Sequence, residues 1–148
     1  MKTKYIDTVI KILQAEVDGD FKCAMGMMSE SYTQTWMYET EKGALFPSVV
    51  KPKESEMKDV YEISGRSYTI YDIAENNNTV YVECIESYPK QNSDGYHKTP
   101  LILVVKFNSE DKIEAGRHYC DPKLSYKTLS EEEISKAYLG QEPILIIK

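Results

Sequence analysis

The stretch SYTIYDIAENNNTVYVECIESYP, residues 67–89, carries the strongest structural signal in the sequence. Two runs rich in β-branched and aromatic residues lie on either side of an asparagine triplet, residues 76–78. β-Branched and aromatic residues favour strands, whereas asparagine favours turns. The stretch therefore predicts a hairpin of two long antiparallel strands.

Two further runs of the same kind follow the hairpin. TPLILVVKFN (99–108) comes after the loop KQNSDGYHK (90–98), and KIEAGRHY (112–119) follows the turn that begins at Ser109. Short turns between such runs favour antiparallel neighbours. The sequence thus predicts a meander of about four long strands.

Helical periodicity precedes the strands. Apolar residues recur at steps of three and four from Tyr5 to Val17, which predicts a helix that ends at the Asp18-Gly19 pair. Asp20 suits the N-cap of a second helix, and the spacing of Tyr32 and Trp36 predicts its continuation.

Two shorter helices are predicted further along the chain. One is a short helix over residues 53–61, between a proline-containing irregular segment and the hairpin. The other begins at Ser130, because Glu133 three residues later completes a capping-box pattern.

These elements indicate an α+β fold in one domain that spans residues 1–148. Two to three N-terminal helices are expected on one face of a strongly curved antiparallel sheet, with a short helix near the C-terminus. A pocket between helices and sheet is the natural place for a ligand.

Composition excludes several classes of function. The net charge of −6 leaves no basic surface for nucleic acid, and no stretch approaches the ~20 apolar residues of a membrane span. Cys23, Cys84 and Cys120 have no CxxC spacing and cannot complete a zinc motif with the two histidines. We therefore expect a cytoplasmic protein with reduced thiols, no bound metal and no cofactor.

The order of elements resembles the SnoaL-like polyketide cyclase branch of the nuclear-transport-factor-2-like, or cystatin-like, superfamily. The resemblance rests on the Gly19-Asp20 pair, on DGYHKTPLILVVKF (94–107) at a strand entry, and on the strand from Lys112 that ends in Tyr119 to Asp121. It implies an α+β cone around an apolar cavity, and a homodimer through the outer sheet face. It also implies either a cyclase or isomerase acting on a small apolar carbonyl compound or a non-catalytic ligand-binding or accessory domain.

The resemblance also implies the catalytic residues. In family cyclases an acidic residue near the end of the last strand acts as acid and base beside a histidine, and Asp121 and His118 match these positions. Strand alternation predicts that Glu114, Gly116, His118 and Cys120 share one face, and that Ile113, Ala115, Arg117, Tyr119 and Asp121 share the other. His118 is the residue expected in the cavity, unless a bulge brings both inward.

Each candidate also has a structural interpretation. His118 could hydrogen-bond across the sheet, and Asp121 could end the strand before Pro122. Arg117 could pair with a strand carboxylate such as Glu83 or Glu86. The residues expected to contact a ligand are Tyr32, Trp36, Tyr71, Glu83, Glu114 and Arg117. Tyr32 and Trp36 could instead be core, and Glu83 could face solvent or a second subunit.

Overall fold

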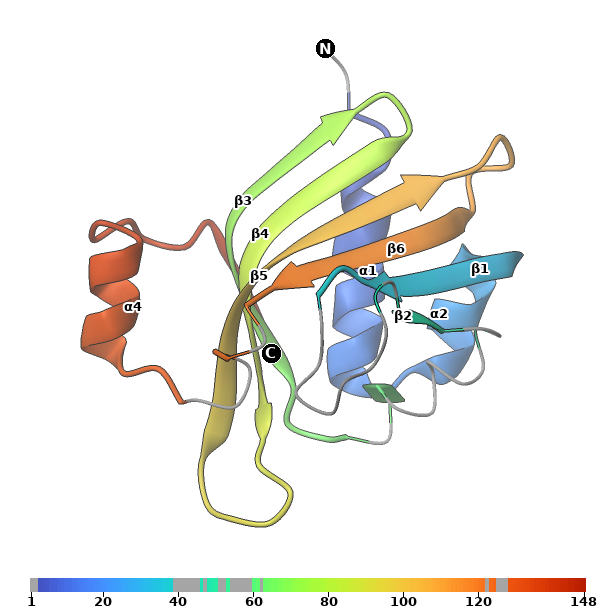
Figure 1. Cartoon of the computed structure of the whole chain (residues 1–148). Helices are drawn as coiled ribbons and strands as arrows, with labels where there is room; N and C mark the ends of the chain where they lie inside the picture. The colour runs from blue at the N-terminus through green and yellow to red at the C-terminus, as the bar shows by residue number, and fades with distance from the viewer. Residues whose placement is uncertain are drawn as a thin grey trace.

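A curved sheet with helices on both faces makes up the fold (Figure 1). The structure, a computed structural model, describes residues 3–38, 46, 48–50, 53, 60–61, 63–121, 123–124 and 128–148. Its helices and strands are, in chain order, α1 (Ile6–Asp18), α2 (Phe21–Met27), β1 (Met28–Trp36), β2 (Ser48–Val50), β3 (Ser67–Asn76), β4 (Thr79–Pro89), β5 (Tyr96–Phe107), β6 (Ile113–Cys120), α4 (Glu131–Ala137) and β7 (Leu145–Ile147).

The sheet has the strand order β2-β1-β6-β5-β4-β3-β7 within the described residues. All neighbours are antiparallel except β1 and β6, which run parallel. The predicted α+β class and the curved, mostly antiparallel sheet are confirmed. The four predicted strands correspond to β3, β4, β5 and β6, and they are joined at the edges by β1, β2 and β7.

Local sequence signals fix several boundaries. Gly19 adopts a left-handed φ of 69° and ends α1, as a glycine after a helix commonly does. The side chain of Asp20 accepts a hydrogen bond of 3.1 Å from the backbone N–H of Cys23 at the start of α2. Ser130 and Glu133 form the predicted capping box of α4. These three predictions needed only neighbouring residues.

The segment that carries Tyr32 and Trp36 differs from the prediction. It is strand β1 rather than a continuation of the second helix. Residues four apart share a face in a helix and also in a strand, so their spacing alone does not separate the two. Of the helix predicted over residues 53–61, Lys53, Val60 and Tyr61 are helical, and residues 54–59 lie outside the described part.

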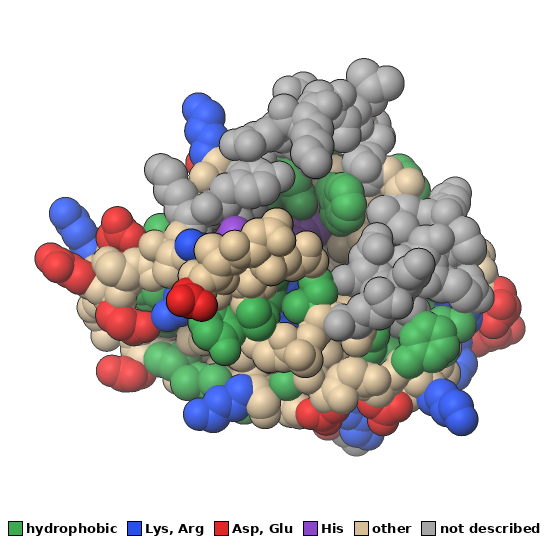
Figure 2. Space-filling view, turned by 90° about the horizontal axis from the view of Figure 1, so that it is seen from below, with side chains coloured by type: hydrophobic (Ala, Val, Ile, Leu, Met, Phe, Trp, Pro, Cys, Tyr) green, Lys and Arg blue, Asp and Glu red, His purple; other side chains and the backbone are tan. Residues whose placement is uncertain are grey.

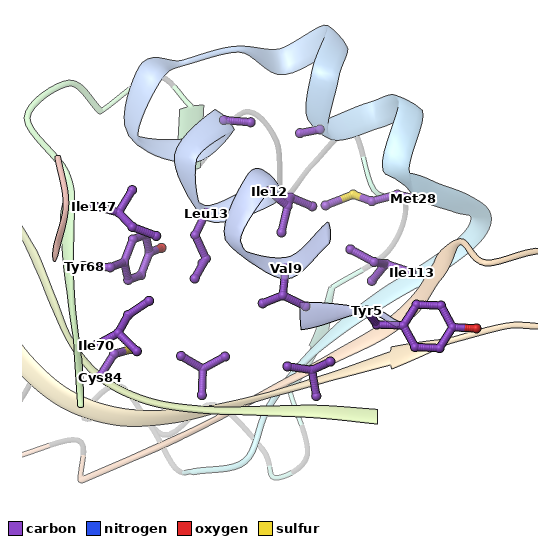
Figure 3. Close-up of a cluster of buried hydrophobic side chains, with 14 of the residues drawn as sticks. Tyr5, Val9, Ile12, Leu13, Met28, Tyr68, Ile70, Cys84, Ile113 and Ile147 are labelled. Atoms are coloured by element: carbon purple, nitrogen blue, oxygen red, sulfur yellow. The ribbon is translucent and has the colours of Figure 1, made fainter. Parts of the chain in front are cut away.

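The main core lies between α1 and the concave face of the sheet (Figure 3). Val9, Ile12 and Leu13 of α1 are at most 5% exposed and point toward the strands. Opposite them lie Tyr68 of β3 and Ile113 of β6, each 2% exposed. The apolar stripe predicted for the first helix is therefore the face that α1 buries.

A second, smaller cluster lies on the opposite face, where α4 packs (Figure 1). Ile134 of α4 meets Tyr71 and Ile85 of the sheet, and the rings of Tyr71 and Tyr138 stack with centroids 3.8 Å apart. The predicted short C-terminal helix thus packs on the face opposite to α1. The short final helix covers part of the outer face.

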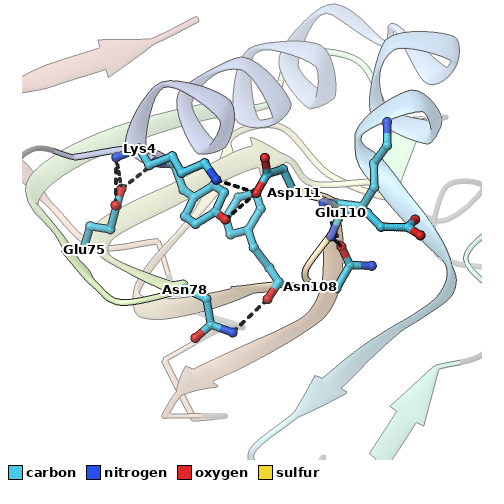
Figure 4. Close-up of polar contacts among 9 residues, drawn as sticks. Lys4, Glu75, Asn78, Asn108, Glu110 and Asp111 are labelled. Carbon is cyan, nitrogen blue, oxygen red and sulfur yellow. Dashed lines mark hydrogen bonds and ion pairs between the residues drawn. The ribbon is translucent and has the colours of Figure 1, made fainter.

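Polar contacts fasten the start of α1 to the ends of two hairpins (Figure 4). The carboxylate of Glu75 accepts hydrogen bonds from the backbone N–H groups of Lys4, Tyr5 and Ile6. The side chains of Lys4 and Tyr5 both donate to Asp111, at 2.8 and 2.6 Å. A carboxylate at a helix N-terminus satisfies N–H groups that have no partner within the helix.

Irregularities in the ladders decide which residues face inward. The register between β5 and β6 shifts where Lys106 pairs with Ala115 and Phe107 pairs with Ile113, so Glu114 is an extra residue in β6. A bulge of this kind reverses the alternation of the strand. Ile113 therefore lies on the inner face with His118, and its predicted place on the opposite face is wrong.

We expect the two isoleucines Ile113 and Ile146 to differ in their importance for stability. Ile113→Ala should lower the free energy of unfolding by about 2–4 kcal/mol, because it empties a fully enclosed position. Ile146, at 51% exposed, is the matched control, and Ile146→Ala should cost less than about 1 kcal/mol. Urea denaturation of both variants measures the difference, and equal costs would contradict this description of the core.

Candidate functional site

A cavity of about 270 Å³ lies between α1 and the concave face of the sheet. Its walls are mainly apolar side chains from α1, β1, β5 and β6. An engineered cavity of about 150 Å³ takes a benzene molecule, so a compound of one or two fused rings suits this volume. In Figure 2, hydrophobic side chains and histidine atoms lie near the middle of the face, with charged side chains toward its edge.

Four polar side chains from α1 and the β3–β4 hairpin meet in the cavity wall. Arg66 donates a hydrogen bond of 2.7 Å to Glu86, and the two side chains are 6% and 14% exposed. The hydroxyl of Tyr68 donates to Glu16 and, at 3.1 Å, to Glu86. Buried ion pairs contribute little to stability once desolvation is counted, so this network points to a role in the cavity.

The carboxyl group of Glu16 is tuned to neutral pH. Burial raises the pKa of Glu16 from its ordinary 4.5 to about 7, although the hydrogen bond from Tyr68 and the charge of Arg66 act in the opposite direction. Burial also raises the pKa of Tyr68 well above its ordinary value, so this phenol remains a donor. Near pH 7, Glu16 is therefore present in both protonation states.

His118 lines the cavity from β6, as predicted. Burial lowers the pKa of its imidazole, while the charges of Glu86 and Arg66 act on it in opposite directions. The edge of its ring meets Tyr38, with centroids 5.7 Å apart. A histidine with a lowered pKa is neutral at pH 7 and can accept a proton.

Tyr32, Trp36 and Arg117 also line the cavity. Tyr32 and Trp36 extend from β1, where Trp36 pairs in register with His118. Arg117 borders the cavity next to His118 in β6, but strand alternation directs its largely exposed side chain to the outer face of the sheet. Three of the six residues expected to contact a ligand are thus at the cavity.

Asp121, the other catalytic candidate, is not among the lining residues. It is exposed, and its carboxylate accepts a hydrogen bond of 2.9 Å from the backbone N–H of Lys123. This is the turn-forming role open to an aspartate before proline. His118 and Asp121 are therefore not brought together in the cavity.

The remaining candidates lie elsewhere. Tyr71 packs under α4 on the outer side, as described above. Glu83 faces away from the core side of β4, and Glu114 lies at the bulge with its carboxylate 3.8 Å from the amino group of Lys106. None of the three lines the cavity.

The polar network is not among the features predicted from the sequence, although two of its members interrupt an apolar pattern. Glu16 follows Ile12 and Leu13 by four and three residues, so it interrupts the apolar stripe of α1. Glu86 shares the inward alternation of Val82 and Cys84. A carboxylate at a position predicted to be buried is the pattern that identifies such a site.

No cluster of three or more His, Cys, Asp or Glu side chains suitable for a metal ion occurs in the described ranges. No helix in this part of the chain has the length and apolar character to cross a membrane.

Solved structures of similar shape exist, although by sequence neither a family model nor a curated protein matches the chain. A nuclear-transport-factor-2-like protein of unknown function from Cytophaga hutchinsonii is 15% identical, with a TM-score of 0.64 over 86% of this chain and 98% of its own. A protein named a SnoaL-like polyketide cyclase, from Jannaschia sp. CCS1, is 9% identical, with a TM-score of 0.66 over 82% of this chain and 91% of its own.

A third similar structure holds a ligand. It is a Mycobacterium tuberculosis protein in complex with estradiol-17beta-hemisuccinate, 8% identical, with a TM-score of 0.70 over 83% of this chain and 98% of its own. The expected resemblance to nuclear-transport-factor-2-like proteins, SnoaL-like cyclases among them, is confirmed at the level of the fold. Identities this low establish the fold alone.

Glu16 should make stability depend on pH near neutrality. Because its folded-state pKa is raised, the stability that its protonated form contributes is complete below about pH 4.5 and is lost as pH rises through about 7. Glu16→Gln removes this dependence while keeping an acceptor for Tyr68. Between pH 4.5 and 8, the variant should gain on the order of 3 kcal/mol relative to wild type.

Urea denaturation of wild type and Glu16→Gln at several pH values measures this difference. Glu132→Gln, on the exposed side of α4, is the matched control and should follow wild type throughout. Parallel stability curves for wild type and Glu16→Gln would show that Glu16 titrates alike in the folded and unfolded states.

Proposed function

We propose that this protein binds a small, mostly apolar carbonyl compound in the cavity and moves protons on it without a cofactor, as a cyclase or isomerase does. The observation that carries the proposal is the convergence of two titratable groups on one apolar cavity. His118 enters the cavity from β6, and Glu16 enters it from α1. Burial lowers the pKa of His118, so its imidazole is neutral and can accept a proton, and burial raises the pKa of Glu16 to about 7, so its carboxyl group can donate one. A cavity lined only by apolar groups would instead favour simple binding.

The roles of the two groups follow from their charge states. Neutral His118 can take a proton from the carbon beside a carbonyl group, and the electrons of that C–H bond then move to the carbonyl oxygen as an enolate forms. Protonated Glu16 can supply a proton to the ligand from the other wall. The developing negative charge on the oxygen requires a hydrogen-bond donor in the cavity.

The size and lining of the cavity support a ring compound as the ligand. The fold of the M. tuberculosis neighbour accommodates a steroid ester, which supports the same choice. The alternative is a non-catalytic ligand-binding domain. It is favoured by the fact that Glu16, Tyr68, Glu86 and Arg66 already hydrogen-bond to one another.

Exchange of carbon-bound protons separates these two functions. The probe is 2-tetralone, a bicyclic ketone, in deuterated buffer near neutral pH, with its α-protons followed by NMR. Wild type should accelerate the exchange, and His118→Gln should lower the protein-catalysed rate by about 100-fold, since a positioned base contributes 10²–10⁴.

His97→Gln is the matched control for this experiment, because His97 is the other histidine and does not line the cavity. It should keep the wild-type rate. Binding of 2-tetralone without any acceleration by wild type would leave the binding domain as the function, and the catalytic proposal would fail.

We also propose a homodimer through the uncovered part of the outer sheet face. Tyr81 and Tyr119 are 42% and 38% exposed there, and the half-buried Ile102 lies between them; Val104, opposite Tyr81, is already buried. The same patch holds both an acidic and a basic residue, Glu83 and Arg117, so two copies related by a two-fold axis could pair them. The apolar contacts of α4 are with Tyr71 and Ile85, outside this patch.

Sedimentation velocity at micromolar concentration tests the dimer. Wild type should sediment at twice the monomer mass of 17.0 kDa. Tyr119→Glu should shift it toward monomer, because a carboxylate would be buried in an apolar contact. Leu139→Glu, an equally drastic change at a residue that is 93% exposed beyond α4, should remain dimeric. A monomeric wild type would refute the dimer.

A further inference from the structure

A glycine in the middle of β6 lies directly beneath a polar pair of β1. Gly116 is in the cavity wall, paired in register with Gln34. A Cβ atom at position 116 would lie 2.2 Å from the amide oxygen of Gln34 and 2.9 Å from the hydroxyl of Tyr32. Glycine within a strand weakens it and often marks a close approach. Here the close approach is that of the Gln34 amide.

The orientation of that amide is fixed by its neighbours. The hydroxyl of Tyr32, which is 5% exposed, donates a hydrogen bond of 2.9 Å to the amide oxygen of Gln34. The oxygen is therefore held against β6, and the NH₂ end of the amide is turned away from it. Among the residues that the structure describes, no acceptor for this NH₂ group is found.

Gln34 and the proposed base belong to successive inward pairs of β1 and β6. Gln34 pairs with Gly116, and the next inward pair along the same two strands is Trp36 with His118. Inward positions on one strand repeat at roughly 7 Å. A carbonyl oxygen bound to the amide of Gln34 can therefore hold the carbon beside it within reach of His118.

We propose that Gln34 determines ligand specificity by donating a hydrogen bond from its Nε2 to the carbonyl oxygen of the ligand, with Tyr32 and Gly116 holding the amide in place. This inference rests on the proposed function, and it supplies the donor that an enolate oxygen requires. A site built in this way discriminates against a ligand of the same shape that lacks the oxygen.

Two probes of nearly equal shape test the inference: 2-tetralone and tetralin, the hydrocarbon without the oxygen. Dissociation constants for both are measured by NMR titration. Wild type should bind the ketone more tightly. Gln34→Met should weaken ketone binding by about tenfold, the value of one hydrogen bond, and should leave tetralin binding nearly unchanged.

Two further variants complete the design. Gly116→Ala keeps Gln34 but displaces its amide, so it should lose the same preference for the ketone; if it folds poorly, Gln34→Met decides. Thr33→Val is the matched control, since Thr33 is the neighbour of Gln34 on β1 and is not a lining residue. It should keep the wild-type preference.

The outcomes separate this inference from the proposed function. The role of Gln34 would be overturned if wild type bound ketone and hydrocarbon equally, or if Gln34→Met kept the preference for the ketone. The proton-exchange experiment tests catalysis separately. A ketone preference that depends on Gln34 without any proton exchange would support the amide contact in a binding domain. Binding of neither probe would overturn both proposals.

Discussion

The packing of α1 across the concave face of the sheet is the contact on which the rest of the structure depends. Val9, Ile12 and Leu13 form one side of the core and also one wall of the cavity, so stability and site come from the same helical face. One turn further along, that face presents Glu16. Its carboxylate is therefore positioned by a helix whose place is determined by the burial of its neighbours.

The protonation states of the titratable groups in the cavity depend on their burial. In water, Glu16 would be ionised at neutral pH and His118 would have an ordinary pKa, whereas burial brings the pKa of the acid near 7 and lowers that of the imidazole. An apolar enclosure thus converts two common side chains into a base and an acid that coexist at the same pH. This is the physical basis for preferring proton transfer over passive binding.

Features of the fold that depend on neighbouring residues could be predicted from the sequence. Features that depend on contacts between distant segments could not. The end of α1 at Gly19 and the capping box at Ser130 are local signals, and the long hairpin follows from alternation and a turn. Strand β1 was not predicted, because the four-residue spacing of Tyr32 and Trp36 fits both the period of a helix and that of a strand. The inward position of Ile113 depends on a bulge at Glu114, and Arg66 acquires its partners only through tertiary structure.

The parallel pairing of β1 with β6 has a consequence for folding. The two strands are far apart in the chain, and Gln34 meets Gly116 only after the β3–β5 meander has been arranged. Contacts of such large sequence separation carry a high loop-closure entropy, while the β3–β4 hairpin requires only a two-residue turn. We therefore expect the wall that holds Trp36 and His118 to be among the last parts of the sheet to form. Because Met28 of β1 and Ile113 of β6 belong to the main core, the core and the cavity are then completed in the same step.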